Sequence, residues 1–397
     1  MRRKALASIV AVAVPRPSLR LLLLVGVSIV ALASPANAAE VEKIADGLDN
    51  PRHLAFGGDD LYVAEAGRGG PGPCFPGPEG GPVCVGATGA VTVVDDDGDQ
   101  RRLVEGLASI ASQGLGESAD GPHGIYVKGK NDVLVTNGGP LYANRDELAA
   151  QNPVAELFGR VLRIDRDGGI ESPADIWDFE RDNNPHAVAV DSNAVDVLVD
   201  CGRLVVADAG GNTLLKVNKH GTVKLLRVFA DRLVQDPFGP GEIPMQTVPT
   251  GVVKGPHGDY FMSQLTGFPF PVGAANVYRV DRNTGAAEIF ARGFTNIMDL
   301  AFDEDGTLWV LEIDHDSLLT PSSDGAIFAI HENGERKQLE LEPGTLTLPG
   351  GITVGEDGAL YVTNKATAAG DGEVLRIEVG EDEDEDDDHD GDHGHDD

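Results

Sequence analysis

One phrase recurs six times along this chain, and the repetition limits the fold more than any other feature of the sequence. Each copy has a turn residue, two variable positions, an apolar triplet, a Gly/Asp-rich turn and a second apolar stretch ending on an oxygen-bearing residue. The copies run 51–65, 122–137, 194–208, 249–264, 297–312 and 349–364. Alternation with a period of two between Gly/Asp turns predicts β-strands and excludes helical repeats.

Further apolar stretches complete each repeat as a four-stranded unit. A third strand follows every copy, and a fourth follows in five of them. The sixth copy lacks a fourth strand, but residues 41–48 (VEKIADGL) match its pattern and precede the first copy. This arrangement predicts an all-β, six-bladed β-propeller with four-stranded blades. The N-terminal strand would close the ring by pairing in the last blade, which removes the exposed edges of an open sheet.

The two ends of the chain differ from the repeats. Residues 1–38 combine five basic residues, an apolar run at 21–33 and a small-x-small site at 36–38, so they read as a signal peptide. An uncleaved anchor is the alternative. Residues 381–397 hold 12 acids and 3 histidines and no apolar residue, which predicts a disordered tail. The expected domains are therefore a signal at 1–38, a propeller at 39–380 and a tail at 381–397, in a secreted or periplasmic protein.

The net charge of the chain restricts the kinds of partner that it can bind. The chain has 31 Lys and Arg against 65 Asp and Glu, a formal net charge of −34. A polyanion lacks the cationic patch that nucleic-acid or anionic-membrane binding requires. No segment after the signal approaches membrane-spanning length. We therefore expect a monomer that binds a small molecule or an extracellular protein, with no nucleic acid and no membrane span.

Loop lengths predict which face of the propeller carries function. The turns after the first and third strands are short throughout, whereas the loops after the second strands reach about 23 residues in blade one. Long, variable loops on a rigid scaffold are where binding usually occurs, so the long-loop side is the expected binding face. The loop of blade one holds Cys74 and Cys84, for which we predict a disulfide, while Cys201 should remain free.

A first ring of candidate residues ends the six second strands. All six residues bear oxygen, and three are anionic: Glu65, Asp208 and Glu312. One interpretation is local bonding of backbone groups at turns. The other is a set of hard ligands for Ca²⁺, which takes six to eight oxygens. With His123, these three acids are the metal-ligand candidates.

A second ring lies where the innermost strands enter the central channel. His53, His123, Asp196 and Asp299 occupy these positions and could bind a ligand, coordinate Ca²⁺ or Zn²⁺, or act as acid and base. Glycines at neighbouring ring positions are expected to leave the channel open. The competing interpretation is that these side chains satisfy backbone groups at the channel mouth.

One apolar segment stands out on the long-loop side. Phe268 and Phe270 alternate with prolines in the loop 265–273 of blade four (LTGFPFPVG). If exposed, they form a ligand or partner surface; if buried, they only seal the loop.

Several of these phrases together resemble the ScyD/ScyE family. They include GLDNPRHLAF, LYVAEAGRGGPGPC, RLVVADAGGN, LTGFPFPVGAANVYRV and GFTNIMDLAF, and the resemblance covers nearly all of residues 41–378. It implies a secreted or periplasmic six-bladed propeller of the NHL-like or TolB-like type, with no established catalytic residues. More distantly, Pro122-His123 resembles the innermost strand of amidating-lyase-like propellers, whose further histidines are not matched at Val195, Thr250, Met298 or Gly350.

Two functions from different classes follow from these patterns. The first is a binding propeller without turnover, favoured because no complete catalytic constellation is evident. The second is a metal-dependent hydrolase or lactonase with Ca²⁺ or Zn²⁺ at the channel mouth, supported by the two polar rings and by a negative field that attracts cations.

Overall fold

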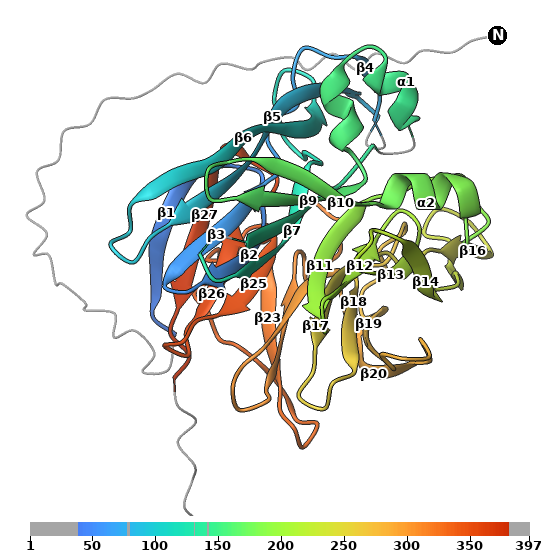
Figure 1. Ribbon diagram of the computed structural model, residues 1–397. Coiled ribbons are helices and arrows are strands. Elements are labelled where there is room, and N and C mark those ends of the chain that lie inside the picture. The colour runs from blue at the N-terminus through green and yellow to red at the C-terminus, as the bar shows by residue number, and fades with distance from the viewer. Residues whose placement is uncertain (1–38, 78–79, 131, 141–142, 381–397) are drawn as a thin grey trace, which may run out of the picture. The chain divides into compact units, whose positions relative to one another are not determined.

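A computed structural model describes residues 39–77, 80–130, 132–140 and 143–380. These residues form six antiparallel blades, each with its first strand innermost (Figure 1). The predicted signal and tail lie outside the described residues. In the part of the chain that is described, no helix has the length and apolar character needed to cross a membrane.

The strands of the first three blades follow the repeats. Blade one holds β2 (Pro51–Gly57), β3 (Asp60–Glu65), β5 (Pro82–Val94) and β6 (Gln100–Ser112), with the short β4 (Cys74–Pro76) also paired to β5. Blade two holds β7 (Pro122–Lys128), β8 (Asp132–Asn137), β9 (Arg160–Asp165) and β10 (Ile170–Asp175). Blade three holds β11 (Ala194–Asp200), β12 (Arg203–Asp208), β13 (Thr213–Val217) and β14 (Val223–Val228).

The last three blades continue the pattern. Blade four holds β17 (Pro249–Lys254), β18 (Tyr260–Gln264), β19 (Ala275–Val280) and β20 (Ala287–Phe294). Blade five holds β21 (Ile297–Phe302), β22 (Leu308–Glu312), β23 (Ala326–Ile330) and β24 (Arg336–Gln338). Blade six holds β25 (Gly351–Val354), β26 (Leu360–Asn364) and β27 (Ala369–Ile377), and its outer strand is β1 (Val41–Asp49).

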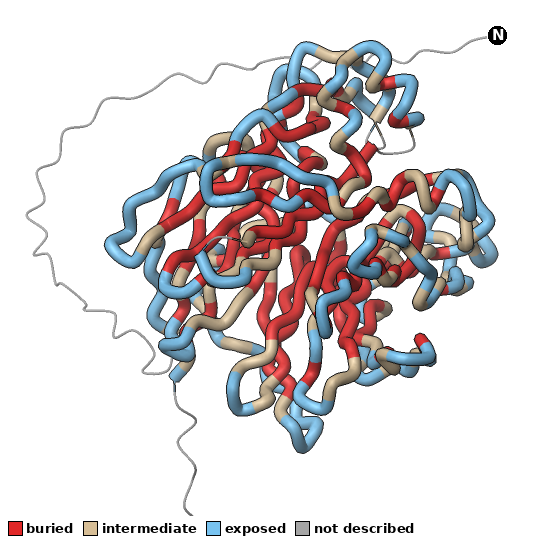
Figure 2. The backbone as a smooth tube through the Cα atoms, viewed as in Figure 1, coloured by how far each residue is buried: buried red, intermediate tan, exposed pale blue. Residues whose placement is uncertain are grey.

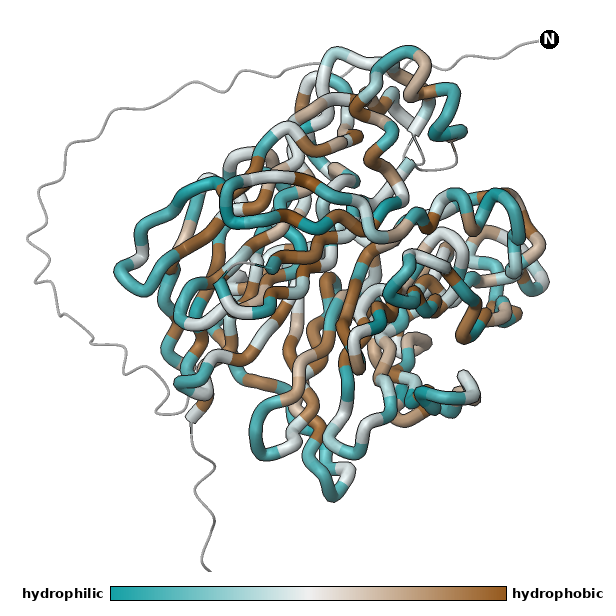
Figure 3. The backbone as a smooth tube through the Cα atoms, viewed as in Figure 1, coloured by the Kyte–Doolittle hydropathy of each residue, from teal (hydrophilic) through white to brown (hydrophobic). Residues whose placement is uncertain are grey.

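The predicted closure of the ring is confirmed. Strand β1 pairs with β27 along its length, so the first and last described strands lie side by side (Figure 1). Buried apolar clusters fill every interface between neighbouring blades, and the one between blades six and one includes Ala45, Leu48 and Val374. Strand interiors are accordingly buried and apolar, while the turns between them are exposed and polar (Figures 2 and 3). The core is thus a ring of interfaces, as expected when each sheet covers the face of the next.

The long-loop side carries ordered structure that the sequence did not reveal. The long loop of blade one is largely a hairpin of β4 with an extension of β5, fastened by the predicted Cys74–Cys84 disulfide, and Cys201 is free. Two helical segments, α1 (Arg145–Ala149) and the 3₁₀ turn Pro153–Leu157, occupy the loop of blade two. Helix α2 (Ile176–Asn183) and the hairpin of β15 (Arg232–Gln235) and β16 (Glu242–Met245) lie in the links before blades three and four.

Candidate functional site

The axis of the propeller is built from the third residue of each repeat. In chain order these residues are His53, Gly124, Asp196, Gly251, Asp299 and Gly351. The ionisable side chains therefore come from blades one, three and five, whereas blades two, four and six have glycine at the same position. Functional side chains thus recur in every second blade, which gives the axis an approximate threefold pattern within the six-bladed ring.

The glycines allow their neighbours to approach the axis. A Cβ atom at Gly124 would lie 2.3 Å from the Cα of Asp196, and one at Gly351 would lie 2.7 Å from the Cα of His53. Real Cβ atoms do not tolerate such distances, so a side chain at either position would push the adjoining inner strand away. The expectation that the glycines leave the channel open was wrong, because they permit close packing of adjacent blades.

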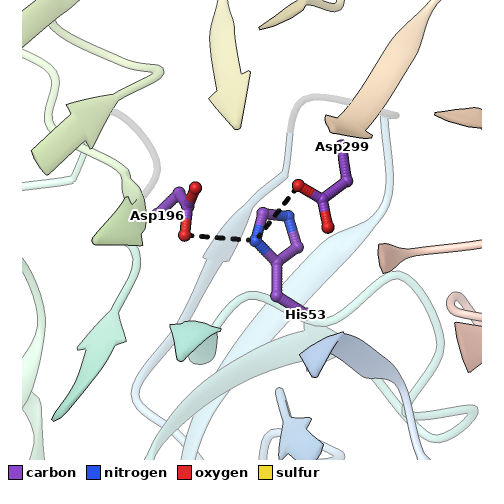
Figure 4. A group of neighbouring side chains, drawn as sticks. All are labelled: His53, Asp196 and Asp299. Carbon is purple, nitrogen blue, oxygen red and sulfur yellow. Dashed lines mark ion pairs between the residues drawn. The ribbon is translucent and has the colours of Figure 1, made fainter. Parts of the chain in front are cut away.

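His53, Asp196 and Asp299 converge into one buried group, the axial triad (Figure 4). The Nδ1 atom of His53 lies 3.3 Å from Oδ1 of Asp196 and 4.0 Å from Oδ1 of Asp299. All three residues are buried, with at most 6% of their surface exposed. This confirms that three of the second-ring candidates meet, but corrects the expectation that they line an open mouth.

Backbone amides hold the two carboxylates in place. Asp196 accepts hydrogen bonds from the N–H of Val197 at 2.7 Å and, in the next blade, from that of Val252 at 2.7 Å. Asp299 repeats the pattern with Leu300 at 2.8 Å and Ile352 at 2.9 Å. Each carboxylate therefore links two neighbouring blades and remains oriented toward His53.

The imidazole of His53 compensates for the negative charge of the two carboxylates in the triad. Burial lowers the pKa of His53, but the carboxylates of Asp299 and Asp196 outweigh it and raise the pKa to about 9. Burial raises the pKa of Asp299 to about 6, with Asp196 adding to the rise and His53 opposing it. At neutral pH the structure thus holds an imidazolium between two carboxylates, which is an ion network joining blades one, three and five.

His123 lies beside the triad without joining it. Its ring meets that of His53 edge to face at 5.1 Å, and its Nδ1 lies 2.9 Å from the carbonyl oxygen of Val195. Burial, followed by the charge of His53, lowers its pKa well below the ordinary value. A neutral imidazole bonded to a backbone carbonyl fits the structural interpretation of this residue.

The triad has donors suited to a metal ion. One imidazole nitrogen and two carboxylate oxygens lie within 4.8 Å of one another, and no other such group occurs in the described ranges. Mixed nitrogen and oxygen donors suit Zn²⁺ better than the all-oxygen preference of Ca²⁺. The His53 Nε2 atom is buried without a hydrogen-bond partner among the residues described, so one polar atom of the triad remains unpaired.

The first ring does not form one site. Glu65, Asp208 and Glu312 are each fully buried. Each accepts a backbone N–H from a residue just before the first strand of its own blade, namely Asp49 at the end of β1, Asn193 and Thr295. None of the three belongs to the group able to hold a metal. Their role in this geometry is therefore to bond the backbone that enters the first strand of each blade.

Aromatic side chains form an exposed surface on the long-loop side. Phe268 is 45% exposed, and its ring stacks at 6.1 Å on that of Phe238, which is 79% exposed. Phe270 is half-buried and meets Phe268 edge to face at 6.4 Å. We call Phe238, Phe268 and Phe270 the aromatic patch. Phe238 was not predicted as a site residue, although its setting, DPFGPG, resembles that of Phe268 in alternating an aromatic with Pro and Gly.

The backbone beneath the aromatic patch is fixed from several sides. The N–H of Gly267 donates to the carbonyl of Gln246 at 2.9 Å, which ties loop 265–273 to the link that follows β16. The hydroxyl of Ser317 donates to the carbonyl of Phe270 at 2.6 Å. The patch is therefore carried by the link before blade four and by the loop of blade four, and Ser317 of blade five holds that loop by a hydrogen bond.

Comparisons with known proteins bear on the fold alone. No family model matches the chain, and no curated protein sequence matches it. A protein of unknown function from Bacteroides thetaiotaomicron is 11% identical over 86% of this chain and 76% of its own, with a TM-score of 0.53. An assigned oxidoreductase (glucose dehydrogenase) from Thermus thermophilus is 18% identical over 86% of this chain and 100% of its own, with a TM-score of 0.50.

A virginiamycin B lyase from Staphylococcus aureus is also similar, at 19% identity over 62% of this chain and a TM-score of 0.38. The chain spans 64% of the length of that lyase. A likeness this low carries no argument about activity. The blades and the two stronger likenesses identify the chain as a six-bladed β-propeller protein.

Proposed function

We propose that this chain is a secreted propeller of the ScyD/ScyE type that binds a partner protein through its long-loop side, without turnover. The observation that carries the proposal is the aromatic patch, in which the rings of Phe238 and Phe268 are exposed on backbone held by hydrogen bonds. Exposed aromatics on a monomer mark interaction surfaces, and aromatic anchors dominate binding energy where partners meet. The axial triad, in contrast, is too buried to touch a partner directly.

The chemistry around the patch points to a basic, apolar partner. The hairpin that carries Phe238 holds two acids, Asp236 and Glu242, against one base, Arg232, and adds exposed Leu233. Exposed Val272 extends the apolar surface in the loop of Phe268. A whole-chain charge of −34 reinforces the acidic rim. Complementary charge steers such encounters, and a projecting surface suits a protein better than a small molecule, which prefers a concave site.

We expect a double variant, Phe238→Ala with Phe268→Ala, to lose binding of a basic apolar probe. The probe is a short amphipathic Lys/Leu peptide, titrated against the full-length protein by fluorescence anisotropy. Because a buried aromatic anchor contributes about 2 kcal/mol or more, removing two should weaken binding by at least about tenfold.

Phe290→Ala supplies the matched control, since Phe290 is 44% exposed but lies on β20, outside the patch. Its affinity for the peptide should equal that of the wild type. A Glu/Leu peptide should bind none of the three proteins, because the rim is acidic. Equal affinities of the double variant and the control for the Lys/Leu peptide would show that charge alone attracts it, and the proposal would fail.

A metal-dependent hydrolase or lactonase is the second candidate function. The observation that favours it is the axial triad, whose three donor atoms and unpartnered His53 Nε2 suit a cation such as Zn²⁺. His53, Asp196 and Asp299 would hold the ion, which would act as a Lewis acid. Burial of all three residues weighs against it, because a substrate must reach the ion.

A further inference from the structure

A pocket lies between blades one and two on the short-turn side of the propeller, opposite the aromatic patch. Its volume is about 360 Å³, and its lining residues are Asp60, Tyr62, Arg101, Leu103, Lys130 and Arg166. Asp60 and Arg101 lie at the starts of β3 and β6, directly after the two short turns of blade one. Lys130 and Arg166 lie in the two short turns of blade two. The pocket therefore forms where the turns of two neighbouring blades meet.

Contacts between the two blades hold the walls of the pocket in place. The hydroxyl of Tyr62, a residue that is 1% exposed, donates a hydrogen bond to the carbonyl oxygen of Lys130 at 3.3 Å. A Cβ atom at Gly58 would lie 3.1 Å from Cε of Lys130, and one at Gly168 would lie 3.3 Å from the carbonyl oxygen of Leu103. The turns of blade two thus pack directly on blade one at two points beside the pocket.

Two of the three cations that line the pocket have no counterion in the part of the chain that is described. Arg101 and Arg166 are exposed, and the side chain of neither makes an ion pair or a hydrogen bond with another described residue. Lys130 lies 3.1 Å from Oδ1 of Asp60 and 3.8 Å from Oδ2 of Asp59. The lining therefore holds three cations against one carboxylate, in a chain whose formal net charge is −34.

Acids close in sequence to the arginines have other partners. Asp165, next to Arg166, accepts two backbone N–H groups of its own turn, at 2.9 and 2.8 Å. Asp95 does the same in the turn before β6, where it accepts a backbone N–H at 2.8 Å. The charge of Asp96 acts on Lys130. The two guanidinium groups are therefore left for a ligand.

We propose that this pocket binds a small organic phosphate monoester, with Arg101 and Arg166 contacting the phosphate and with Leu103 and the ring of Tyr62 contacting the organic part. A phosphate monoester has a charge of about −1.5 to −2 at neutral pH, which matches three cations and one carboxylate. Guanidinium groups suit phosphate oxygens, because each presents several N–H donors in a planar fork.

The size of the pocket favours a small ligand over a macromolecule. Sites for small molecules occupy about 300–1,000 Å³, and this pocket lies near the lower limit of that range. It lies on the other side of the propeller from the aromatic patch. The inference therefore does not depend on the proposed binding of a partner protein.

The test is calorimetric titration of the full-length protein with phenyl phosphate, at low ionic strength because salt screens exposed cations. The wild type should bind one phenyl phosphate per chain. Arg101→Gln and Arg166→Gln should each weaken binding by at least about tenfold, because each removes a charge-assisted contact. Benzoate, which has a single negative charge, should bind to the wild type more weakly than phenyl phosphate.

Lys219→Gln is the matched control. Lys219 is exposed and lies in the turn between β13 and β14 of blade three, which corresponds to the turn of Arg166 in blade two. This variant should bind phenyl phosphate as the wild type does. All three variants should melt at the wild-type temperature, because the replaced side chains are exposed, so that a loss of binding is not a loss of folding.

Several results would overturn the proposal. Equal affinities of the two arginine variants and Lys219→Gln would mean that phenyl phosphate does not bind in this pocket. The absence of binding to the wild type, or binding of benzoate as tightly as phenyl phosphate, would exclude a phosphate site. Binding only by a chain that ends at residue 380 would assign the pocket to the acidic tail in place of a ligand.

Discussion

Replacing Asp299 by alanine should destabilise the propeller by about 3–5 kcal/mol, the cost of removing one partner from a buried ion pair. The substitution leaves the imidazolium of His53 with Asp196 alone and removes the acceptor of two backbone amides, Leu300 and Ile352. These amides belong to blades five and six, so the loss acts on the interface between them. Urea unfolding followed by tryptophan fluorescence measures the change.

Asp305→Ala is the control for that variant, because Asp305 is an exposed acid in the turn after the same strand. We expect it to change stability by less than about 0.5 kcal/mol, as is usual for surface substitutions. An Asp299→Ala protein as stable as this control would mean that the axial triad does not join the blades. Elemental analysis of the same proteins addresses the second candidate function: one metal ion per chain in the wild type, absent from Asp299→Ala, would favour the hydrolase.

Deleting residues 39–48 should destabilise the whole ring. Strand β1 would be lost, with buried Ala45 and Leu48, and burial of a leucine side chain alone contributes about 1.5–3 kcal/mol. The edge of β27 would be left unpaired, and exposed strand edges promote association between chains. We expect a lower melting temperature in calorimetry and earlier elution from a size-exclusion column.

Removing an equal length from the other end, residues 388–397, is the control for shortening the chain. We expect it to leave the melting temperature unchanged, because the described blade strands end at Ile377. If the protein lacking residues 39–48 melted at the same temperature as this control, pairing of β1 with β27 would not contribute to the stability of the ring.

The blades could be predicted because their information is local and repeated. Each repeat carries its own turn residues and alternation, so six copies agree on one register, and the start of β11 at Ala194 is confirmed. The hairpin β15–β16 was not predicted, because proline and glycine in PFGPGEIP interrupt the alternation of apolar and polar residues on which strand prediction depends.

Convergence at the axis was only partly predictable. Aligning the repeats places His53, Asp196 and Asp299 at one level, but burial of the triad depends on how closely the blades pack. The role of Gly124 shows the difficulty, since a glycine in a sequence is equally compatible with open space and with close approach.

Hydrogen–deuterium exchange of the full-length protein with and without the Lys/Leu peptide tests the proposed function most directly. We predict that the peptide slows exchange at residues 231–245 and 265–273, the two segments that carry the aromatic patch. Amides around the axial triad should exchange at the same rate in both samples. Protection confined to other segments, or to the inner strands near His53 and Asp299, would contradict binding at the aromatic patch.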